Sequence, residues 1–281
     1  MIDSQTEIRA GERFAFGRNW CDFTETVDEP RIAVATESLT RALDVSDLSE
    51  RTFLDVGCGS GLFSLAACRL GARVRAFDFD ADSVAAASAM RDRFAPDGAW
   101  SVERGSILDE DFVATLGRFD VVYSWGVLHH TGDMWRAMDL LPDLVAPGGR
   151  LYISIYNDQG FESRVWRAVK RRYNRSGPVA RRALVLGSAA YLSRRRLAKR
   201  LLGPAVRPAP SPARAPRARG MSARHDLIDW VGGYPFEVAK PEAVFAFLRE
   251  RGFELCYLKT CGGGLGCNEY VFQRPASDRP A

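Results

Sequence analysis

Short apolar runs alternate with segments of helical apolar spacing between residues 51 and 157, and this alternation constrains the fold more than any other feature. The run FLDVG at 53–57 indicates a strand, and LFSLAACRL a few residues later indicates a helix. A second strand in ARVRAFDFD and a helix over 82–94 complete a strand–helix–strand unit. Such a unit implies parallel strands joined by a right-handed crossover.

The same alternation continues toward the middle of the chain. The expected elements are a third strand at 100–104, a fourth in FDVVYSW, a helix over 134–145, a turn at Pro147-Gly148-Gly149 and a fifth strand in RLYISIY. Strands that alternate with helices predict an α/β fold, here a Rossmann-like, doubly wound and mostly parallel sheet.

The alternation stops after Asn157 and resumes at 241. A helix is predicted over 241–251, and two strands, at 253–260 and 268–273, are separated by GGGLG, which favours a β-hairpin. These two strands bring the sheet to seven. The sequence predicts three parts. An N-terminal helical cap covers 1–50, the core consists of 51–158 and 241–275, and a basic helical insertion covers 159–240.

The net charge of +4 conceals a strongly basic segment. Between Phe161 and Arg224 the chain has 18 arginine and lysine residues and a single acidic residue, Glu162. Apolar residues at four-residue spacing, from Phe161 to Tyr173, predict a cationic amphipathic helix. The run ALVLGSAAYL that follows is too short to span a bilayer but suits a membrane interface.

Residues 161–224 are therefore predicted to contact an anionic membrane surface. One alternative is a helical lid whose arginines are only solvated. Contact with nucleic acid is less favoured, because the segment lacks the interleaved exposed aromatic residues of RNA-binding modules. Residues 203–220, rich in proline, alanine and arginine, are expected to be extended or disordered.

The rest of the composition is ordinary for a globular chain, with 46% hydrophobic and 26% charged residues. The six cysteines show no metal-ligand spacing, so we expect reduced thiols and no metal site. The first residues have neither the basic start nor the apolar run of a secretory signal. We expect a cytoplasmic protein, with the basic segment available for peripheral attachment to the inner face of the membrane.

A glycine loop joins the first predicted strand to its helix. Glycines there expose main-chain N–H groups at a helix N-terminus and let a ligand approach closely. Gly57, Gly59 and Gly61 have G-x-G-x-G spacing, whereas a dinucleotide fingerprint would need its third glycine at Leu62. This spacing argues against NAD. A phosphate-binding P-loop is excluded because no Gly-Lys-Ser/Thr sequence follows.

Asp78 ends the second predicted strand, where a carboxylate can accept hydrogen bonds from both ribose hydroxyls of an adenosine. Parallel strands bring their C-terminal ends to one crevice, so Asp78 and the glycine loop should meet there. The alternatives for Asp78 are a solvated strand end or the N-cap of the next helix, a role that Asp80 or Asp82 could also fill.

Five segments, in this order and spacing, resemble the successive motifs of class I S-adenosylmethionine-dependent methyltransferases: DVGCGSG, RAFDFD, GSILD, FDVVYSWGVLHH and APGGRLYISI. The resemblance implies S-adenosyl-L-methionine as the cofactor, with Asp78 on its ribose and Phe79 against its adenine. Ser106 and Ile107 would line the adenine pocket, and Trp125 would lie beside the methionine part or the sulfonium. The loop residues implied around the methionine part are Asp55, which acts indirectly, and Gly57, Cys58, Gly59 and Gly61.

The stretch RFAFGRNWCDFTETVDEPRI resembles the cap of ubiquinone-biosynthesis O-methyltransferases of the 2-polyprenyl-6-hydroxyphenol methylase type, through Phe14, Trp20 and Asp22. After the fourth strand those enzymes have Leu-Glu-His, whereas this chain has His129 in place of the glutamate. The resemblance implies methyl transfer to a hydroxyl of an aromatic or quinone-like small molecule, whose polyprenyl tail could stay in a bilayer. The open alternatives are a natural-product tailoring methyltransferase acting at O, N or C, an RNA-modifying methyltransferase, and a non-catalytic adenosine-binding scaffold.

His129 and His130 follow the fourth predicted strand and are the candidate catalytic bases. An unperturbed imidazole can remove a proton near neutral pH. The alternative for either histidine is a structural hydrogen bond at the start of a helix. A further segment, His225 onward (HDLIDWVGGYPFEV), could close over the acceptor, although Trp230 and Tyr234 within it could equally belong to the core.

Overall fold

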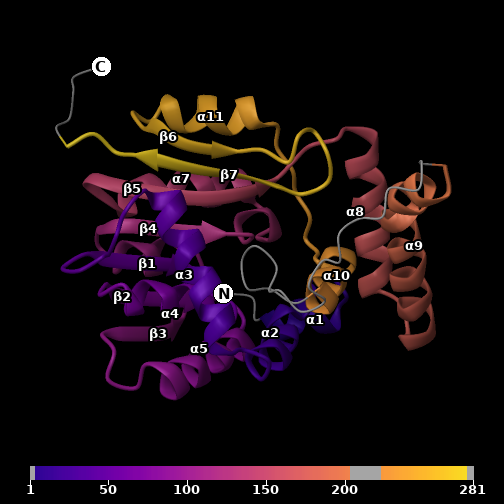
Figure 1. The fold of residues 1–281 in the computed structure, drawn as a ribbon, viewed down its shortest axis with the longest axis horizontal. Coiled ribbons are helices and arrows are strands. Elements are labelled where there is room, and N and C mark those ends of the chain that lie inside the picture. The colour runs from indigo at the N-terminus through magenta and orange to yellow at the C-terminus, as the bar shows by residue number, and fades with distance from the viewer. Residues whose placement is uncertain (1–3, 203–222, 277–281) are drawn as a thin grey trace.

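The computed structural model describes residues 4–202 and 223–276, and its centre is a seven-stranded sheet in the order β3-β2-β1-β4-β5-β7-β6 (Figure 1). The predicted extended segment at 203–220 lies outside the described residues. The strands are β1 (Thr52–Val56), β2 (Arg73–Asp78), β3 (Trp100–Arg104), β4 (Phe119–Trp125), β5 (Val145–Tyr156), β6 (Glu254–Lys259) and β7 (Cys267–Gln273). The helices are α1 (Ser4–Arg9), α2 (Phe16–Thr24), α3 (Glu29–Leu43), α4 (Leu62–Arg69), α5 (Ala81–Phe94), α6 (Glu110–Ala114), η1 (Leu128–His130), α7 (Met134–Leu144), α8 (Phe161–Asn174), α9 (Pro178–Leu202), α10 (Ala223–Gly232) and α11 (Pro241–Arg249).

The strand pairing confirms the predicted Rossmann-like fold. Strands β1 to β5 are parallel, while β7 runs antiparallel to both β5 and β6 and so forms the C-terminal hairpin. The chain leaves β1 toward β2 on one side and returns to β4 on the other. The C-terminal ends of β1 and β4 therefore flank a topological switch point, the usual ligand site of such sheets.

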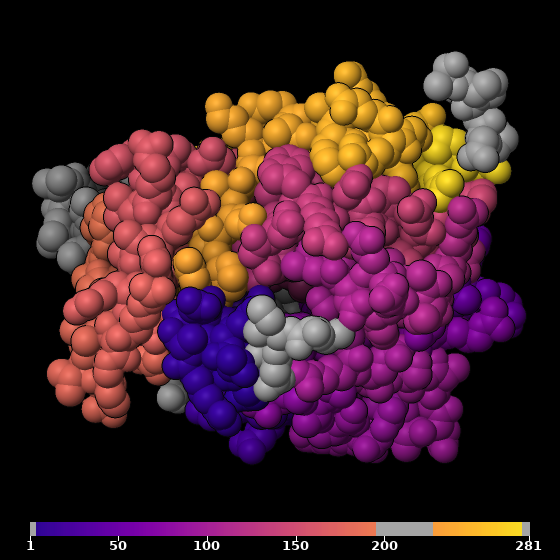
Figure 2. Space-filling view, turned by 180° about the vertical axis from the view of Figure 1, so that it is seen from behind, coloured from indigo at the N-terminus to yellow at the C-terminus, as the bar shows by residue number. Residues whose placement is uncertain are grey.

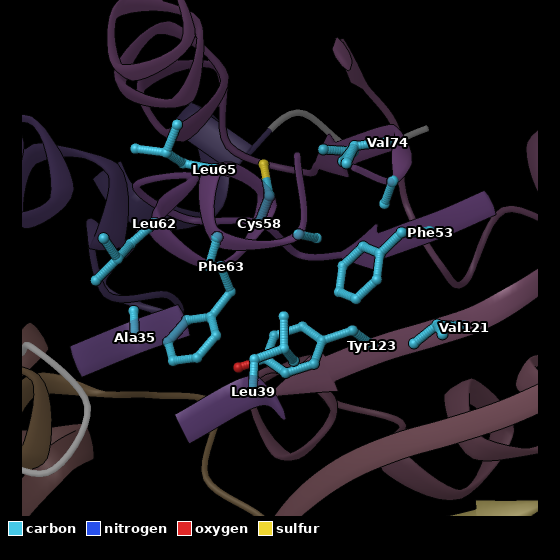
Figure 3. Close-up of a cluster of buried hydrophobic side chains, with 14 of the residues drawn as sticks. Ala35, Leu39, Phe53, Cys58, Leu62, Phe63, Leu65, Val74, Val121 and Tyr123 are labelled. Atoms are coloured by element: carbon cyan, nitrogen blue, oxygen red, sulfur yellow. The ribbon is translucent and has the colours of Figure 1, made fainter. Parts of the chain in front are cut away.

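A separate apolar cluster covers each face of the sheet. In β1, Phe53 points into one cluster while Leu54 and Val56 point into the other, as the two-residue period of a strand requires. Helices α3, α4 and α5 pack on the first face, where Phe63 stacks on Tyr123 with ring centroids 5.2 Å apart (Figure 3). Helices α6, α7 and α11 pack on the second face. The two layers hold the strand ends rigidly beneath the site.

Helices α8, α9 and α10 gather beside the sheet, next to the ends of the strands where α1 and α2 also lie (Figure 1). Helix α10 contacts α8, α9 and α2, so it joins this group to the N-terminal helices. In the described parts of the chain, no helix combines the length and the apolar character that crossing a bilayer requires.

The predicted turn at Pro147-Gly148-Gly149 is wrong, because these residues lie within β5. The pairing of β4 with β5 shifts register between Phe119 and Val121, so the segment forms a bulge rather than a turn. Gly148 adopts φ +77° there, which a residue with a side chain rarely does. The preceding helix therefore ends at Leu144, one residue earlier than predicted.

Candidate active site

The loop after β1 presents bare main chain to solvent-accessible space. Gly57 and Gly59 have φ +76° and +55°, left-handed values that favour glycine. The loop is anchored to β2, because the N–H groups of Gly57 and Cys58 donate to the carbonyl oxygen of Phe77 at 2.9 and 3.0 Å. A Cβ on Gly57 would lie 2.3 Å from Cγ1 of Val127, so no side chain fits there.

The Asp78 carboxylate is attached directly to this loop. Its Oδ2 accepts a hydrogen bond from Gly59 N at 3.0 Å, and its Oδ1 accepts one from Asp80 N at 2.9 Å. Burial raises the pKa of Asp78 to about 6, against the opposing effect of these main-chain donors. The N-cap of α5 is Asp80, whose side chain accepts from Asp82 N, so the N-cap interpretation of Asp78 is wrong.

A cavity of about 1090 Å³ opens over these strand ends. Figure 2 shows a hollow where the indigo N-terminal segment meets the magenta part of the chain. Its volume exceeds the roughly 300–1,000 Å³ common for the site of one small ligand, so a cofactor and an acceptor could share it. The lining includes nine residues that the sequence singled out for the cofactor: Asp55, Gly57, Cys58, Gly59, Asp78, Phe79, Ser106, Ile107 and Trp125.

Gly61 is the tenth of those residues and does not line the cavity. It is the N-cap of α4, and a Cβ there would lie 2.9 Å from the Trp100 ring, on the side of the core. Asp55 is buried and accepts a hydrogen bond from Ser64 Oγ at 2.6 Å. This contact fixes the end of β1 against α4 and fits the indirect role expected for Asp55.

His130 lines the cavity, and its tautomer follows from one contact. Nδ1 lies 2.6 Å from the carbonyl oxygen of Pro235, which can only accept, so Nδ1 carries the hydrogen and Nε2 the lone pair. Burial first, and then the positive charge of Lys170, lowers the pKa of His130 to about 3. The imidazole is therefore neutral at pH 7 and a much weaker base than the sequence led us to expect.

His129 is fully buried and does not line the cavity. Its ring lies 3.9 Å from the Tyr156 ring, centroid to centroid, and burial holds its pKa well below the ordinary value. The two adjacent histidines thus occupy different environments, because the turn of η1 directs one ring into the cavity and the other beneath it.

Arg13, a residue that the sequence did not single out, crosses one edge of the cavity. Its Nη1 donates to the carbonyl oxygen of His130 at 2.9 Å, and its guanidinium lies 5.0 Å from the centre of the Phe79 ring. A salt bridge with Glu7 attaches it to α1. No local pattern marks Arg13, because the residue it bonds lies 117 positions further along the chain. Trp20, expected from the cap resemblance, lies directly above Gly59.

One part of the cavity lining, here called the aromatic wall, consists of aromatic side chains. Tyr156, Trp230 and Phe16 line it, and the rings of Tyr156 and Trp230 meet at right angles with centroids 5.2 Å apart. Asp229 lies beside them and accepts a hydrogen bond from Asn19 Nδ2 at 2.7 Å.

This wall contains part of the segment expected to close over the acceptor. Trp230 lines the cavity, whereas Tyr234 does not and instead accepts a hydrogen bond from Phe14 N through its carbonyl oxygen at 2.8 Å. The side chain of His225 lies outside the described residues. Among the residues that the structure describes, no cluster of three or more histidine, cysteine, aspartate or glutamate side chains could hold a metal ion.

These features define a class I α/β methyltransferase site. The bare loop and the carboxylate of Asp78 meet at the switch point of the sheet, as the sequence predicted for the two groups.

Comparison with known proteins identifies the family. A family model described as a methyltransferase domain matches residues 27–201, and the chain belongs to this family. This family agrees with the methyltransferase that the order of the motifs predicted.

The curated relatives are similar over part of their length. Ubiquinone biosynthesis O-methyltransferase of Xanthomonas euvesicatoria pv. vesicatoria is 34% identical over 118 residues, which are 40% of this chain and 45% of the relative. The enzyme of the same name from Rhizobium etli is 30% identical over 104 residues, 37% of this chain and 40% of the relative. The chain thus spans less than half the length of these relatives.

Solved structures support the fold alone. Magnesium protoporphyrin IX methyltransferase from Synechocystis PCC 6803 with bound SAH superposes with a TM-score of 0.50 at 15% identity, covering 98% of this chain and 89% of that one. An O-methyltransferase family protein from Burkholderia thailandensis has the same TM-score and identity and covers 89% of this chain and 57% of that one.

Proposed function

We propose that this methyltransferase acts on a hydroxyl of a small aromatic or quinone-like compound, including polyprenylated ones. The aromatic wall of Phe16, Tyr156 and Trp230 carries the proposal, because such rings bind a flat ligand by edge-to-face and stacking contacts. The similarity to ubiquinone biosynthesis O-methyltransferases over part of the chain supports the same acceptor class.

The cofactor half of the cavity suits S-adenosylmethionine. Asp78 would accept the ribose hydroxyls, Phe79, Ser106 and Ile107 would enclose the adenine, and the glycine loop would follow the methionine part. When bound, the cofactor supplies a methyl group that its sulfonium already makes electrophilic. The chain's main contribution is then to hold the acceptor oxygen in line with that methyl group and to exclude water.

His130 orients the acceptor in this proposal. With Nδ1 held by the Pro235 carbonyl, Nε2 accepts a hydrogen bond from the acceptor hydroxyl. Because the pKa of His130 is about 3, its neutral imidazole is better suited to accept a hydrogen bond and orient the acceptor than to act as a general base. His129 contributes by packing under Tyr156, so its effect on the acceptor is indirect.

Methyl transfer from labelled cofactor to a panel of phenols, catechols and hydroxyquinones tests the acceptor class. We expect labelled methyl ethers and stoichiometric S-adenosylhomocysteine. Binding of the cofactor without transfer to any oxygen acceptor, together with transfer to amines, carbon acids or RNA, would overturn the proposal.

We also propose that the chain is divided into a cap at 1–50, a core at 51–158 and 241–275, and an insertion at 159–240. The insertion contacts an anionic membrane surface in this proposal. Among the described residues, five of the seven exposed large hydrophobic side chains lie on α8 and α9: Phe161, Val165, Val179, Leu186 and Tyr191. Exposed arginines surround them, and the combination of apolar and cationic groups suits an interface with anionic lipid. Peripheral attachment there would bring a polyprenylated acceptor to the cavity.

Cosedimentation with vesicles of phosphatidylglycerol and phosphatidylcholine tests this contact. The double substitution Phe161→Ser and Leu186→Ser should release the protein, whereas Leu258→Ser, which changes an exposed residue on β6, should not. If the protein binds RNA tightly and does not pellet with vesicles of either lipid, nucleic acid rather than the membrane is the partner.

A further inference from the structure

Lys170 lies in the middle of α8 with its side chain fully buried. Its Nζ donates a hydrogen bond to the carbonyl oxygen of Trp230. Three rings surround the ammonium group, with centroids 4.6 Å away for Trp230, 4.7 Å for Phe236 and 5.6 Å for Tyr156. The chain thus places an amino group, cationic below about pH 7, inside an aromatic cage beside the aromatic wall of Phe16, Tyr156 and Trp230, which is called the acceptor wall below.

A hydrogen bond from α8 to a main-chain carbonyl oxygen can be made by a neutral donor. One turn later on the same helix, the uncharged Asn174 bonds the carbonyl oxygen of Gly232 at 2.7 Å. A buried ammonium group is costly, and burial lowers the pKa of Lys170 to about 7 although the negative charge of Asp229 opposes the shift. A buried charge that a neutral side chain could replace suggests a role beyond stability.

The segment that Lys170 holds is the 229–237 strap, which runs from Asp229 in α10 to Glu237. Its backbone is bonded along most of its length by groups from other parts of the chain. From α8, Lys170 donates to the carbonyl oxygen of Trp230, Asn174 to that of Gly232 and Arg167 to that of Phe236. From other parts of the chain, Phe14 N donates to the carbonyl oxygen of Tyr234, and His130 Nδ1 to that of Pro235. Helix α8 supplies three of these five donors.

Lys170 differs from the other donors of α8 in what it touches. Of the three rings in its cage, Trp230 and Tyr156 line the cavity, and Tyr156 also contacts His130 with centroids 5.5 Å apart. Arg167 and Asn174 bond the strap at the carbonyl oxygens of Phe236 and Gly232, and neither residue lines the cavity. Lys170 is therefore the hydrogen-bond donor of α8 that touches the rings of the acceptor wall, while Trp166 of the same helix packs against Trp230 with ring centroids 5.4 Å apart.

We propose that Lys170 is a positioning residue that sets the acceptor wall, holding the Trp230 carbonyl while its ammonium group fixes the planes of the Trp230 and Tyr156 rings. This inference rests on the proposed function for the part that concerns the acceptor. It predicts that losing the cation loosens the strap and weakens acceptor binding, while the cofactor half of the cavity stays intact.

The test compares Lys170→Met, which keeps the length of the side chain, with Lys240→Met, which removes an exposed lysine at the start of α11. Hydrogen exchange of the strap amides, including those of Gly233 and Glu237, should become about 10-fold faster in Lys170→Met and stay unchanged in the control. The KM for the acceptor best methylated by the wild type should rise by about 10-fold or more, with a smaller change in kcat. The Kd of S-adenosylhomocysteine should stay within about twofold of the wild-type value.

Wild-type strap exchange and wild-type acceptor KM in Lys170→Met would overturn the inference, as would equal losses of cofactor and acceptor binding. If the wild type methylates no phenol, the proposed function fails, and strap exchange alone decides whether Lys170 positions this wall. If circular dichroism shows that Lys170→Met does not fold, Lys170→Arg takes its place. The larger guanidinium keeps the charge, so strap exchange should stay slow while the acceptor KM changes; an unchanged KM would refute the role.

Discussion

Replacement of Asp78 by asparagine tests the cofactor site most directly. The carboxylate has two accepting oxygens, already aligned by Gly59 N and Asp80 N, and each could accept one ribose hydroxyl. Asparagine keeps one accepting oxygen, so one hydrogen bond to a charged group is lost. Such a bond contributes about 1.5–3 kcal/mol, which corresponds to a roughly 10- to 150-fold weaker Kd. Asp78→Ala should weaken binding by a few kcal/mol at most.

Isothermal titration with S-adenosylhomocysteine at pH 7.5 measures the change, with Asp92→Asn on the exposed side of α5 as the matched control. Because the pKa of Asp78 is about 6, its carboxyl is protonated as the pH falls below 6 and loses an accepting oxygen. The wild-type Kd should therefore rise between pH 7 and pH 5, while that of Asp78→Asn should change little. A Kd within twofold of the wild type for Asp78→Asn would remove this residue from the site.

Four further outcomes follow from the structure. His130→Ala should lower kcat without weakening cofactor binding, and an equal loss from His129→Ala alone would transfer the role to the buried ring. Since the pKa of His130 is about 3, this residue should produce no inflection near pH 6.5 in the rate profile, and such an inflection lost in His130→Ala would contradict its burial. Gly57→Ala should lower the free energy of unfolding by about 1–3 kcal/mol, because its Cβ would collide with Val127, and denaturant unfolding would detect it. Leu39→Ala in the first core cluster should cost about 2–5 kcal/mol in the same assay, and a cost below that of an exposed site would refute the packing described.

The comparison of sequence with structure is clearest at the strand ends. Strands β1 and β2 and the loop between β1 and α4 follow from patterns that span only a few residues each. Parallel pairing then requires Asp78 and Gly59 to meet, because both follow the C-terminal ends of adjacent strands. The sequence could therefore predict this half of the site before any coordinates.

Other local patterns were misleading because tertiary contacts overruled them. The sequence Pro147-Gly148-Gly149 is typical of a turn, but pairing with β4 continues on both sides of it and makes it a bulge. Gly61 shares the spacing of the loop glycines, yet the direction of α4 turns it toward Trp100 and the core. The two histidines are adjacent in sequence, and only the turn of η1 separates their environments.

The amino-acid sequence by itself determined the sheet, the motif order and the loop that receives the cofactor, since these depend on short-range periodicity and on the geometry of glycine. Only the tertiary structure decided which groups form the acceptor side. Arg13 reaches the carbonyl of His130 across 117 residues of chain, and Lys170 reaches that of Trp230 across 60. Such contacts leave no local pattern, because they arise where packing happens to bring distant segments together, and the burial that lowers the pKa of Lys170 and His130 exists only there.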